Sequence, residues 1–196
     1  MFIQTEPTPN PATLKFVPGV TVMKSGVADF PNPEAAAGKS PLAARLFETD
    51  GVMSIYLGLD FISVTKAEGV EWHHIKPAIL GVIMEHFTAG LPVLTEGADT
   101  GPAGHSSGHN TADADGEHAE IIGQITELLD TRVRPAVAQD GGDITFHGFD
   151  DGIVYLHMQG ACAGCPSSTI TLKHGIENLL RHYIPEVNEV RAVGAF

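Results

Sequence analysis

The stretch that decides the fold runs from residue 143 to residue 165 and reads DITFHGFDDGIVYLHMQGACAGC. Its first part alternates apolar and polar residues on both sides of Asp150–Gly152, which is the pattern of two half-buried strands joined by a tight turn. Its last part carries Cys162 and Cys165, the only two cysteines of the 196-residue chain. The pattern predicts a β-hairpin that leads directly into a loop with two thiols.

Helical patterns flank this hairpin and loop. Before them, apolar residues recur at helical spacing from Ile121 to Val133, and the QDGGD sequence at residues 139–143 predicts a turn that ends this helix. After them, Pro166 and the serines that follow suit the first turn of a second helix, and residues 186–196 predict a last strand. The predicted order is α-β-β-α-β, a small sheet covered by helices, so the fold class is α+β.

A change of composition divides the chain into two parts. Residues 95–117, TEGADTGPAGHSSGHNTADADGE, contain no Lys, no Arg, no aromatic residue and almost no large aliphatic one. Such a segment cannot bury enough apolar surface to offset the entropy of ordering it. We therefore predict a flexible acidic linker between a first domain, residues 1–94, and a second domain, residues 118–196, each a small α/β domain.

The sequence of the first domain predicts short strands and two helices, and it contains no cysteine. FIQTE and TLKFVPG read as strands broken by proline, and Ser40-Pro41 predicts the start of a short helix that reaches about Glu48. Two further β-rich segments surround residues 58–60. A second helix, closed by Gly90, is predicted from apolar residues at four-residue steps: Ile75, Ile79, Ile83 and Phe87.

Charge and hydropathy exclude several classes of function. A formal net charge of −13 disfavours nucleic acid and anionic membrane surfaces as partners, because both require clustered Lys and Arg. No apolar run approaches the roughly 20 residues that span a bilayer. The N-terminus lacks the pattern of a signal peptide or an Arg-rich transit peptide. We expect a soluble protein of a reducing compartment, the bacterial cytoplasm, and an organelle matrix is compatible for a processed chain.

The two cysteines fit several chemistries. A thioredoxin-type redox pair also occupies a strand-to-helix junction, but it comes early in its fold, whereas here only a helix and a strand follow. A zinc site needs about four ligands. The histidines of the second domain are scattered and show no paired spacing: His118, His147, His157, His174 and His182. In the first domain, the side chains of adjacent His73 and His74 are expected to diverge on a helix or a strand. Both alternatives stay open at this point.

An iron–sulfur cluster is the third chemistry. Cys165 is expected at or near a helix N-terminus, where the helix dipole lowers a thiol pKa and favours the metal-binding thiolate. A cubane cluster takes four thiolates, one for each iron. One chain supplies two, so a cubane site requires two chains with the cluster at their interface.

Residues 133–187 resemble the C-terminal domain of NifU and Nfu-type iron–sulfur proteins. The matching elements include Arg134-Pro135, the DGGD sequence at 140–143, GAC at 160–162 and CPSS at 165–168. FIQTEPTPNPATLKFVPG, SPLAARLFETDGV and WHHIKPAI resemble the N-terminal domain of Nfu proteins. DGGD itself favours a structural turn that uses the conformational freedom of glycine.

The resemblance implies an assembly factor and not an enzyme. Such a factor holds a [4Fe–4S] cluster between two protomers of a homodimer, receives it from an upstream donor and passes it to apoproteins. By position, the cluster ligands are Cys162 and Cys165. A thiol–disulfide oxidoreductase that uses the same cysteine pair is the alternative function.

Overall fold

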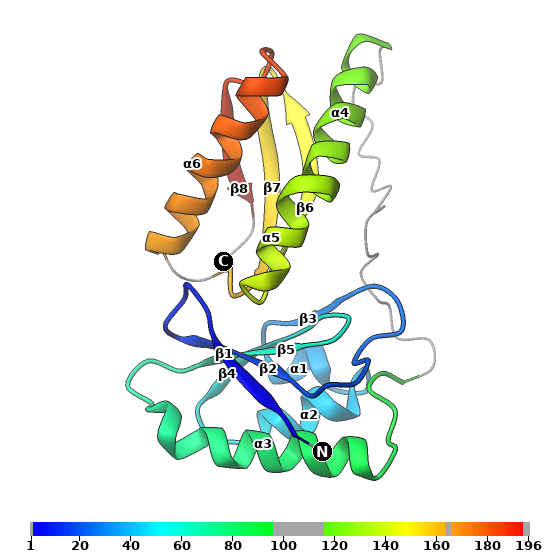
Figure 1. The fold of residues 1–196 in the computed structure, drawn as a ribbon, viewed down its shortest axis with the longest axis vertical. Helices are drawn as coiled ribbons and strands as arrows, with labels where there is room; N and C mark the ends of the chain where they lie inside the picture. The colour runs from blue at the N-terminus through cyan, green and yellow to red at the C-terminus, as the bar shows by residue number, and fades with distance from the viewer. Residues whose placement is uncertain (1, 96–115, 164–165, 194–196) are drawn as a thin grey trace. The chain divides into compact units, whose positions relative to one another are not determined.

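A computed structural model describes residues 2–95, 116–163 and 166–193, with the backbone alone at residues 116–117 and 166–168 (Figure 1). The chain forms two compact units, Met1–Ala103 and Gly104–Phe196. Each unit combines a β-sheet with helices, which confirms the predicted α+β class. Most of the predicted linker lies outside the described residues, and the domain boundaries at residues 94 and 118 stay a prediction.

The first unit is built on a five-stranded antiparallel sheet in the order β1-β2-β5-β4-β3. Helices α2 and α3 pack on one face of it, around a core in which Phe16, Ile55 and Ile62 are fully buried (Figure 1). The elements are β1 Gln4–Pro7, β2 Thr13–Val17, β3 Ala28–Phe30, α1 Pro33–Ala36, α2 Pro41–Phe47, β4 Val52–Leu57, β5 Ile62–Lys66 and α3 Trp72–Thr88.

The start of α2 is confirmed, and the buried face of α3 differs from the prediction at one position. The Ser40 hydroxyl accepts a hydrogen bond from the Ala43 N–H at 3.0 Å, and Pro41 fills the first helical turn. On α3 the buried stripe ends at His86 and not at Phe87. Four-residue steps turn a helix by about 40° too far each time, so the third step must shorten to three residues to keep facing the core.

The second unit confirms the predicted α-β-β-α-β order. Its sheet has the order β6-β7-β8, in which β6 and β7 are antiparallel and β8 joins β7 in parallel (Figure 1). The elements are α4 Gly116–Leu128, a π-helical turn Leu129–Val133, α5 Arg134–Gln139, β6 Gly142–Asp150, β7 Ile153–Gly160, α6 Pro166–Tyr183 and β8 Glu189–Val193.

The hairpin turn between β6 and β7 follows its sequence signal. Asp151 and Gly152 both have positive φ, at 46° and 79°, which is the backbone of a two-residue type I′ turn. The strands pair in register from Asp150 opposite Ile153 to Gly142 opposite Gly160, with one irregularity between Phe146 and Gly148. The register brings the end of the hairpin, where the cysteine loop begins, beside the DGGD turn.

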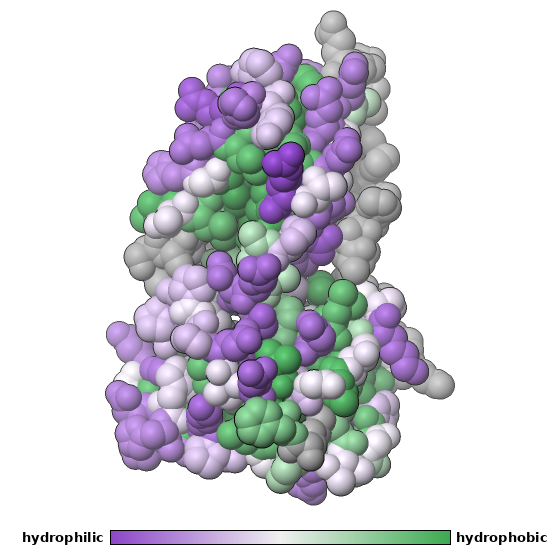
Figure 2. Space-filling view, in the orientation of Figure 1, coloured by the Kyte–Doolittle hydropathy of each residue, from purple (hydrophilic) through white to green (hydrophobic). Residues whose placement is uncertain are grey.

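The hairpin buries one face against the helices of its own unit. Its inward side chains are Ile144, Val154, Leu156 and Met158, and those of the helices are Ile125, Leu129, Val133, Val137, Ile176 and Leu180. Figure 2 shows apolar surface between the polar outer faces of α6 and α4. This amphipathic packing is the main source of stability for a sheet of only three strands.

The helix before the DGGD turn is not a regular α-helix throughout, although its apolar spacing predicts one. It passes through one π turn, in which the Arg134 N–H donates to the Leu129 carbonyl five residues back. Pro135 follows directly and has no N–H to donate to Thr131. The missing bond explains why the helix widens here.

His86 gives the first unit a pH-dependent stability. Its side chain is fully buried, and burial lowers its pKa below the ordinary 6.5. The unfolded chain therefore binds a proton at His86 more readily than the folded chain does. The contribution of His86 to the free energy of unfolding is thus fully present above pH 6.5, and it falls as the pH drops through 6.5 toward the lower pKa of the folded state. We expect the contribution of His86 to the free energy of unfolding, measured as the difference between the wild type and a variant without this histidine, to fall by at most about 1.4 kcal/mol for each pH unit. The fluorescence of Trp72 follows the unfolding.

The His86→Leu variant should lose this dependence, whereas His74→Gln, which alters an exposed histidine of the same helix, should keep it. An identical pH slope in His86→Leu and the wild type would contradict the assignment.

The two units should fold independently. Residues 1–94 and residues 118–196 made as separate chains should each show a cooperative unfolding transition, because each hydrophobic core is formed within one unit. Dispersed amide NMR spectra of the two fragments, superimposable on that of the full chain, would bear this out. A collapsed spectrum for either fragment would show that the boundaries are misplaced.

Candidate functional site

A backbone hydrogen bond fastens the loop after β7 to the DGGD turn, and a second one closes the loop on itself. The Ala161 N–H donates to the Gly141 carbonyl at 3.1 Å, and the Cys162 N–H donates to the Gln159 carbonyl at 3.4 Å. Gly160 and Gly141 have φ values of 62° and 78°, which glycine adopts without strain. The DGGD turn and the cysteine loop, about twenty residues apart in the sequence, thus lie against each other, and Cys162 lies in the loop.

Gly142 makes room for the sulfur of Cys162. A Cβ atom at Gly142 would lie 2.5 Å from the Cys162 Sγ, 2.8 Å from the Gln159 carbonyl oxygen and 3.0 Å from the Cys162 nitrogen. The two backbone contacts cannot be relieved by a side-chain rotation, so any other amino acid here would force the backbone of the loop to shift. Gly141 serves the turn, as the sequence predicts. The close approach at Gly142 has no local sequence signal.

Arg134 and Asp143 hold the DGGD turn against the preceding helix. The Asp143 carboxylate is 4% exposed and accepts two hydrogen bonds from the Arg134 guanidinium, from Nε at 2.8 Å and from Nη2 at 2.7 Å. Arg134 also donates to Asp130 at 3.2 Å, and Asp143 accepts from the Ile144 N–H. The two parallel hydrogen bonds fix the position of the turn relative to Arg134. Breaking the pair would be costly, because loss of either partner leaves a buried charge uncompensated.

Cys162 is a free, buried thiol that keeps its proton. It is 6% exposed, and burial, with the negative charges of Asp140 and Asp143 added, raises its pKa to about 12. At neutral pH the thiol is therefore protonated, and a metal must displace that proton to bind the sulfur. The environment of Cys162 is the opposite of the electropositive setting that activates an attacking cysteine.

Helix α6 holds the other side of the loop. The Thr169 hydroxyl donates to the Cys162 carbonyl at 3.1 Å, which ties the loop to the first turns of this helix. The helix begins at Pro166, as predicted, directly after Cys165 in the sequence. Cys165 lies outside the described residues, and the assignment of Cys162 and Cys165 as cluster ligands stays a prediction.

The histidines of the second unit do not gather around Cys162. His118 packs edge-on against Phe149, and His182 against Tyr183, while His147 and His174 are exposed. His73 and His74, expected to diverge, have ring centroids 3.9 Å apart at the exposed start of α3. Within residues 2–95, 116–163 and 166–193, no group of three or more His, Cys, Asp or Glu side chains could hold a metal ion.

Gly142→Ala should move the cysteine loop. The new methyl group overlaps the Cys162 sulfur and backbone, so we expect a loss of about 1–3 kcal/mol in the free energy of unfolding of the second unit. Gly148→Ala is the matched control, because it lies on the same strand with no atom within 4 Å of the added Cβ. Its stability should stay within about 1 kcal/mol of the wild type.

Chemical denaturation of the two variants measures the difference. Equal free energies of unfolding for Gly142→Ala and Gly148→Ala would show that the cysteine loop can move without loss of stability.

Two protein families match the two units. The family described as "Scaffold protein Nfu/NifU N terminal" matches residues 3–90, and the family described as "NifU-like domain" matches residues 125–191. The second match contains Arg134, the DGGD turn and both cysteines. Among the described residues, no helix is long and apolar enough to cross a membrane.

Relatives that align with nearly all of this chain share both parts. The chain is 51% identical over 194 residues to the human "NFU1 iron-sulfur cluster scaffold homolog, mitochondrial", with 98% of this chain and 72% of that protein aligned. It is 48% identical over 192 residues to "NifU-like protein 4, mitochondrial" of Arabidopsis thaliana, with 97% of this chain and 65% of that protein aligned. A NifU-like protein from Saccharomyces cerevisiae, whose solution structure is known, is 29% identical in sequence to this chain. The structural alignment covers 49% of this chain and 86% of the yeast chain, with a TM-score of 0.45.

Proposed function

Because the chain belongs to the Nfu family of iron–sulfur cluster scaffold proteins, we propose that it holds a [4Fe–4S] cluster between two copies of itself and passes it to apoproteins. The observation that carries this proposal is the free thiol of Cys162 in a loop held by the DGGD turn and by Thr169 of α6. Cys162 and Cys165 are the proposed ligands of each copy.

The surroundings of Cys162 suit a site that receives and releases a cluster. Thiolate sulfur is the preferred ligand of iron–sulfur clusters. The loop contains only small residues between Gly160 and Gly164, so bulky side chains do not block an approaching cluster. Burial keeps the unloaded Cys162 protonated, and a protonated thiol is less reactive toward oxidants. The thiol is thereby preserved until iron displaces the proton.

Sharing the cluster follows from the number of thiols. A cubane cluster takes four thiolates, and each chain has two cysteines, both in the second unit. Two chains related by a two-fold axis complete the set. A site divided between two chains separates readily, which suits a carrier better than an electron-transfer protein.

The oxidoreductase alternative receives no support from Cys162. An attacking thiol needs a lowered pKa, whereas burial raises the pKa of Cys162 to about 12. We therefore expect no catalytic turnover from this chain.

The expected partners are an upstream cluster donor and apo iron–sulfur proteins. The names of the relatives support an organelle matrix as the compartment, and the bacterial cytoplasm stays the prediction from the sequence.

Anaerobic reconstitution tests the proposal directly. With iron and sulfide, the protein should bind about four iron and four sulfide per dimer, because four thiolates ligate one cubane cluster. Iron and sulfide analysis, with the mass from sedimentation before and after chelation, measures both claims. Four iron atoms per chain at monomeric mass would refute the proposal that two chains share the cluster. Bound zinc without any iron–sulfur cluster would refute the proposal that the protein is a cluster carrier.

Replacing either cysteine by serine should abolish stable cluster binding. The alkoxide oxygen is a harder ligand than thiolate sulfur and suits iron–sulfur chemistry poorly. Cys162→Ser and Cys165→Ser should lose the visible absorbance of the reconstituted cluster while far-ultraviolet circular dichroism stays unchanged. Thr171→Ser, a change of similar size on the nearby α6, is the control. A serine variant that keeps a full, stable cluster would remove that cysteine from the ligand set.

A further inference from the structure

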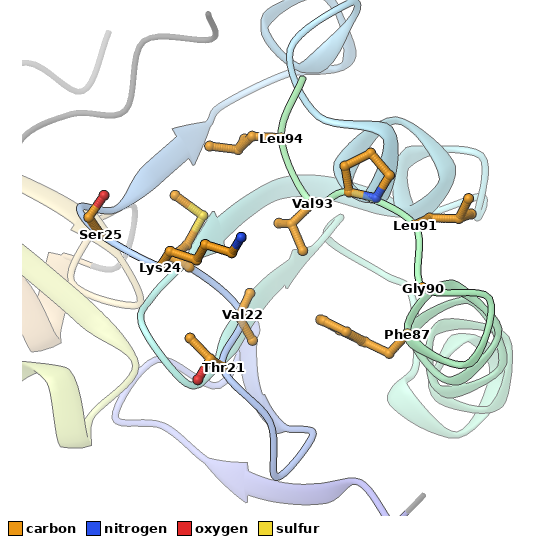
Figure 3. A pocket seen from close by; sticks show the side chains of 11 residues that line it. Thr21, Val22, Lys24, Ser25, Phe87, Gly90, Leu91, Val93 and Leu94 are labelled. Atoms are coloured by element: carbon orange, nitrogen blue, oxygen red, sulfur yellow. The ribbon is translucent and has the colours of Figure 1, made fainter. Parts of the chain in front are cut away.

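A groove of about 620 Å³ lies in the first unit, the unit without cysteine (Figure 3). One wall is residues 21–25, which connect β2 to β3. The other wall is Phe87, near the end of α3, and residues 90–94. The volume falls within the range of about 300–1,000 Å³ that is usual for ligand sites in proteins.

Hydrogen bonds hold both walls in place. The N–H groups of Val22 and Met23 both donate to the Leu59 carbonyl, at 2.8 and 3.1 Å. On the other side, the Ser40 hydroxyl donates to the Val93 carbonyl at 2.6 Å, and the Thr95 N–H donates to the Lys39 carbonyl at 2.8 Å. A groove with fixed walls binds without first ordering its own backbone, which lowers the entropic cost of binding.

The lining is mostly apolar, and its polar residues are Thr21, Lys24 and Ser25. Val22, Phe87 and Val93 face the interior of the groove, and Leu91, at its rim, is 43% exposed (Figure 3). Lys24 extends from its wall toward Val93 (Figure 3), and within the described part of the chain its ammonium group forms no ion pair or hydrogen bond. The groove therefore offers an apolar surface with a single cation beside it.

Charge and shape select the occupant. An unpaired ammonium group beside an apolar surface is complementary to a carboxylate that neighbours a large apolar side chain. The chain's own residues 96–115 carry carboxylates but no aromatic and no large aliphatic side chain, so they cannot fill the groove. The groove is about half open to solvent, which suits a peptide better than a small molecule that must be enclosed.

We propose that this groove docks a short peptide segment of a partner protein, in which a large apolar side chain lies within two residues of Asp or Glu. Val22, Phe87 and Val93 contact the apolar side chain, and Lys24 pairs with the carboxylate. The site would give the first unit a role in partner recognition that does not depend on the cluster.

Peptide selection on the full chain tests the proposal. A phage library of random 12-residue peptides is selected on the wild type and, in parallel, on Lys24→Glu. We expect an enriched family with Leu, Ile, Phe or Met within two residues of Asp or Glu. A synthetic member should bind Lys24→Glu at least tenfold more weakly than the wild type, and Leu91→Ala several-fold more weakly. Lys66→Glu, which alters a partly exposed lysine of the same unit outside the groove, should bind as the wild type does.

Amide chemical shifts then locate the peptide. The largest changes should fall on residues 21–25 and 87–94, and the spectra of the free variants show whether they are folded. The proposal is overturned by the absence of an enriched family, by a family that binds Lys24→Glu equally well, or by shifts outside these residues. It is also overturned if the same amides shift with protein concentration alone, since a second copy would then be the occupant.

Discussion

The contact between Gly142 and the sulfur of Cys162 is the constraint on which the second unit depends. With no side chain at residue 142, the DGGD turn and the cysteine loop come within van der Waals reach, and the Ala161 N–H bonds to Gly141. The Arg134–Asp143 pair anchors the turn to the helix on one side, and Thr169 anchors the loop to α6 on the other. The position of one sulfur atom is therefore determined by the DGGD turn, the helix before it and α6.

Much of this fold is readable from local patterns. The hairpin could be predicted because Asp151 and Gly152 suit a turn with positive φ, and the alternating side chains on either side give the buried face. The start of α2 follows from Ser40 and Pro41 for the same reason: the signal lies within a few adjacent residues. The π turn also had a local signal in Pro135, because a proline inside a helical pattern removes a hydrogen bond.

Other features depend on contacts that no short stretch of sequence contains. Gly142 and Cys162 are twenty positions apart, and only the folded hairpin shows why the second glycine of DGGD is required. The raised pKa of Cys162 arises from burial and from Asp140 and Asp143, which the helix N-terminus argument for the neighbouring cysteine does not anticipate. Strand β3 and helix α1 are too short, at three and four residues, for periodicity to reveal them.

The parallel pairing of β8 with β7 bears on how the protein is synthesised. Strand β8 follows the cysteine loop and the whole of α6 in the chain, yet it lies beside the strand that leads into that loop. A ribosome must therefore produce the chain through Val193, and β8 must clear the exit tunnel, before the sheet of the second unit can close. Such non-local pairing forms late in folding. The first unit, complete much earlier, has by then had time to fold, so the nascent chain presents its finished N-terminal unit before the Cys162 thiol is enclosed.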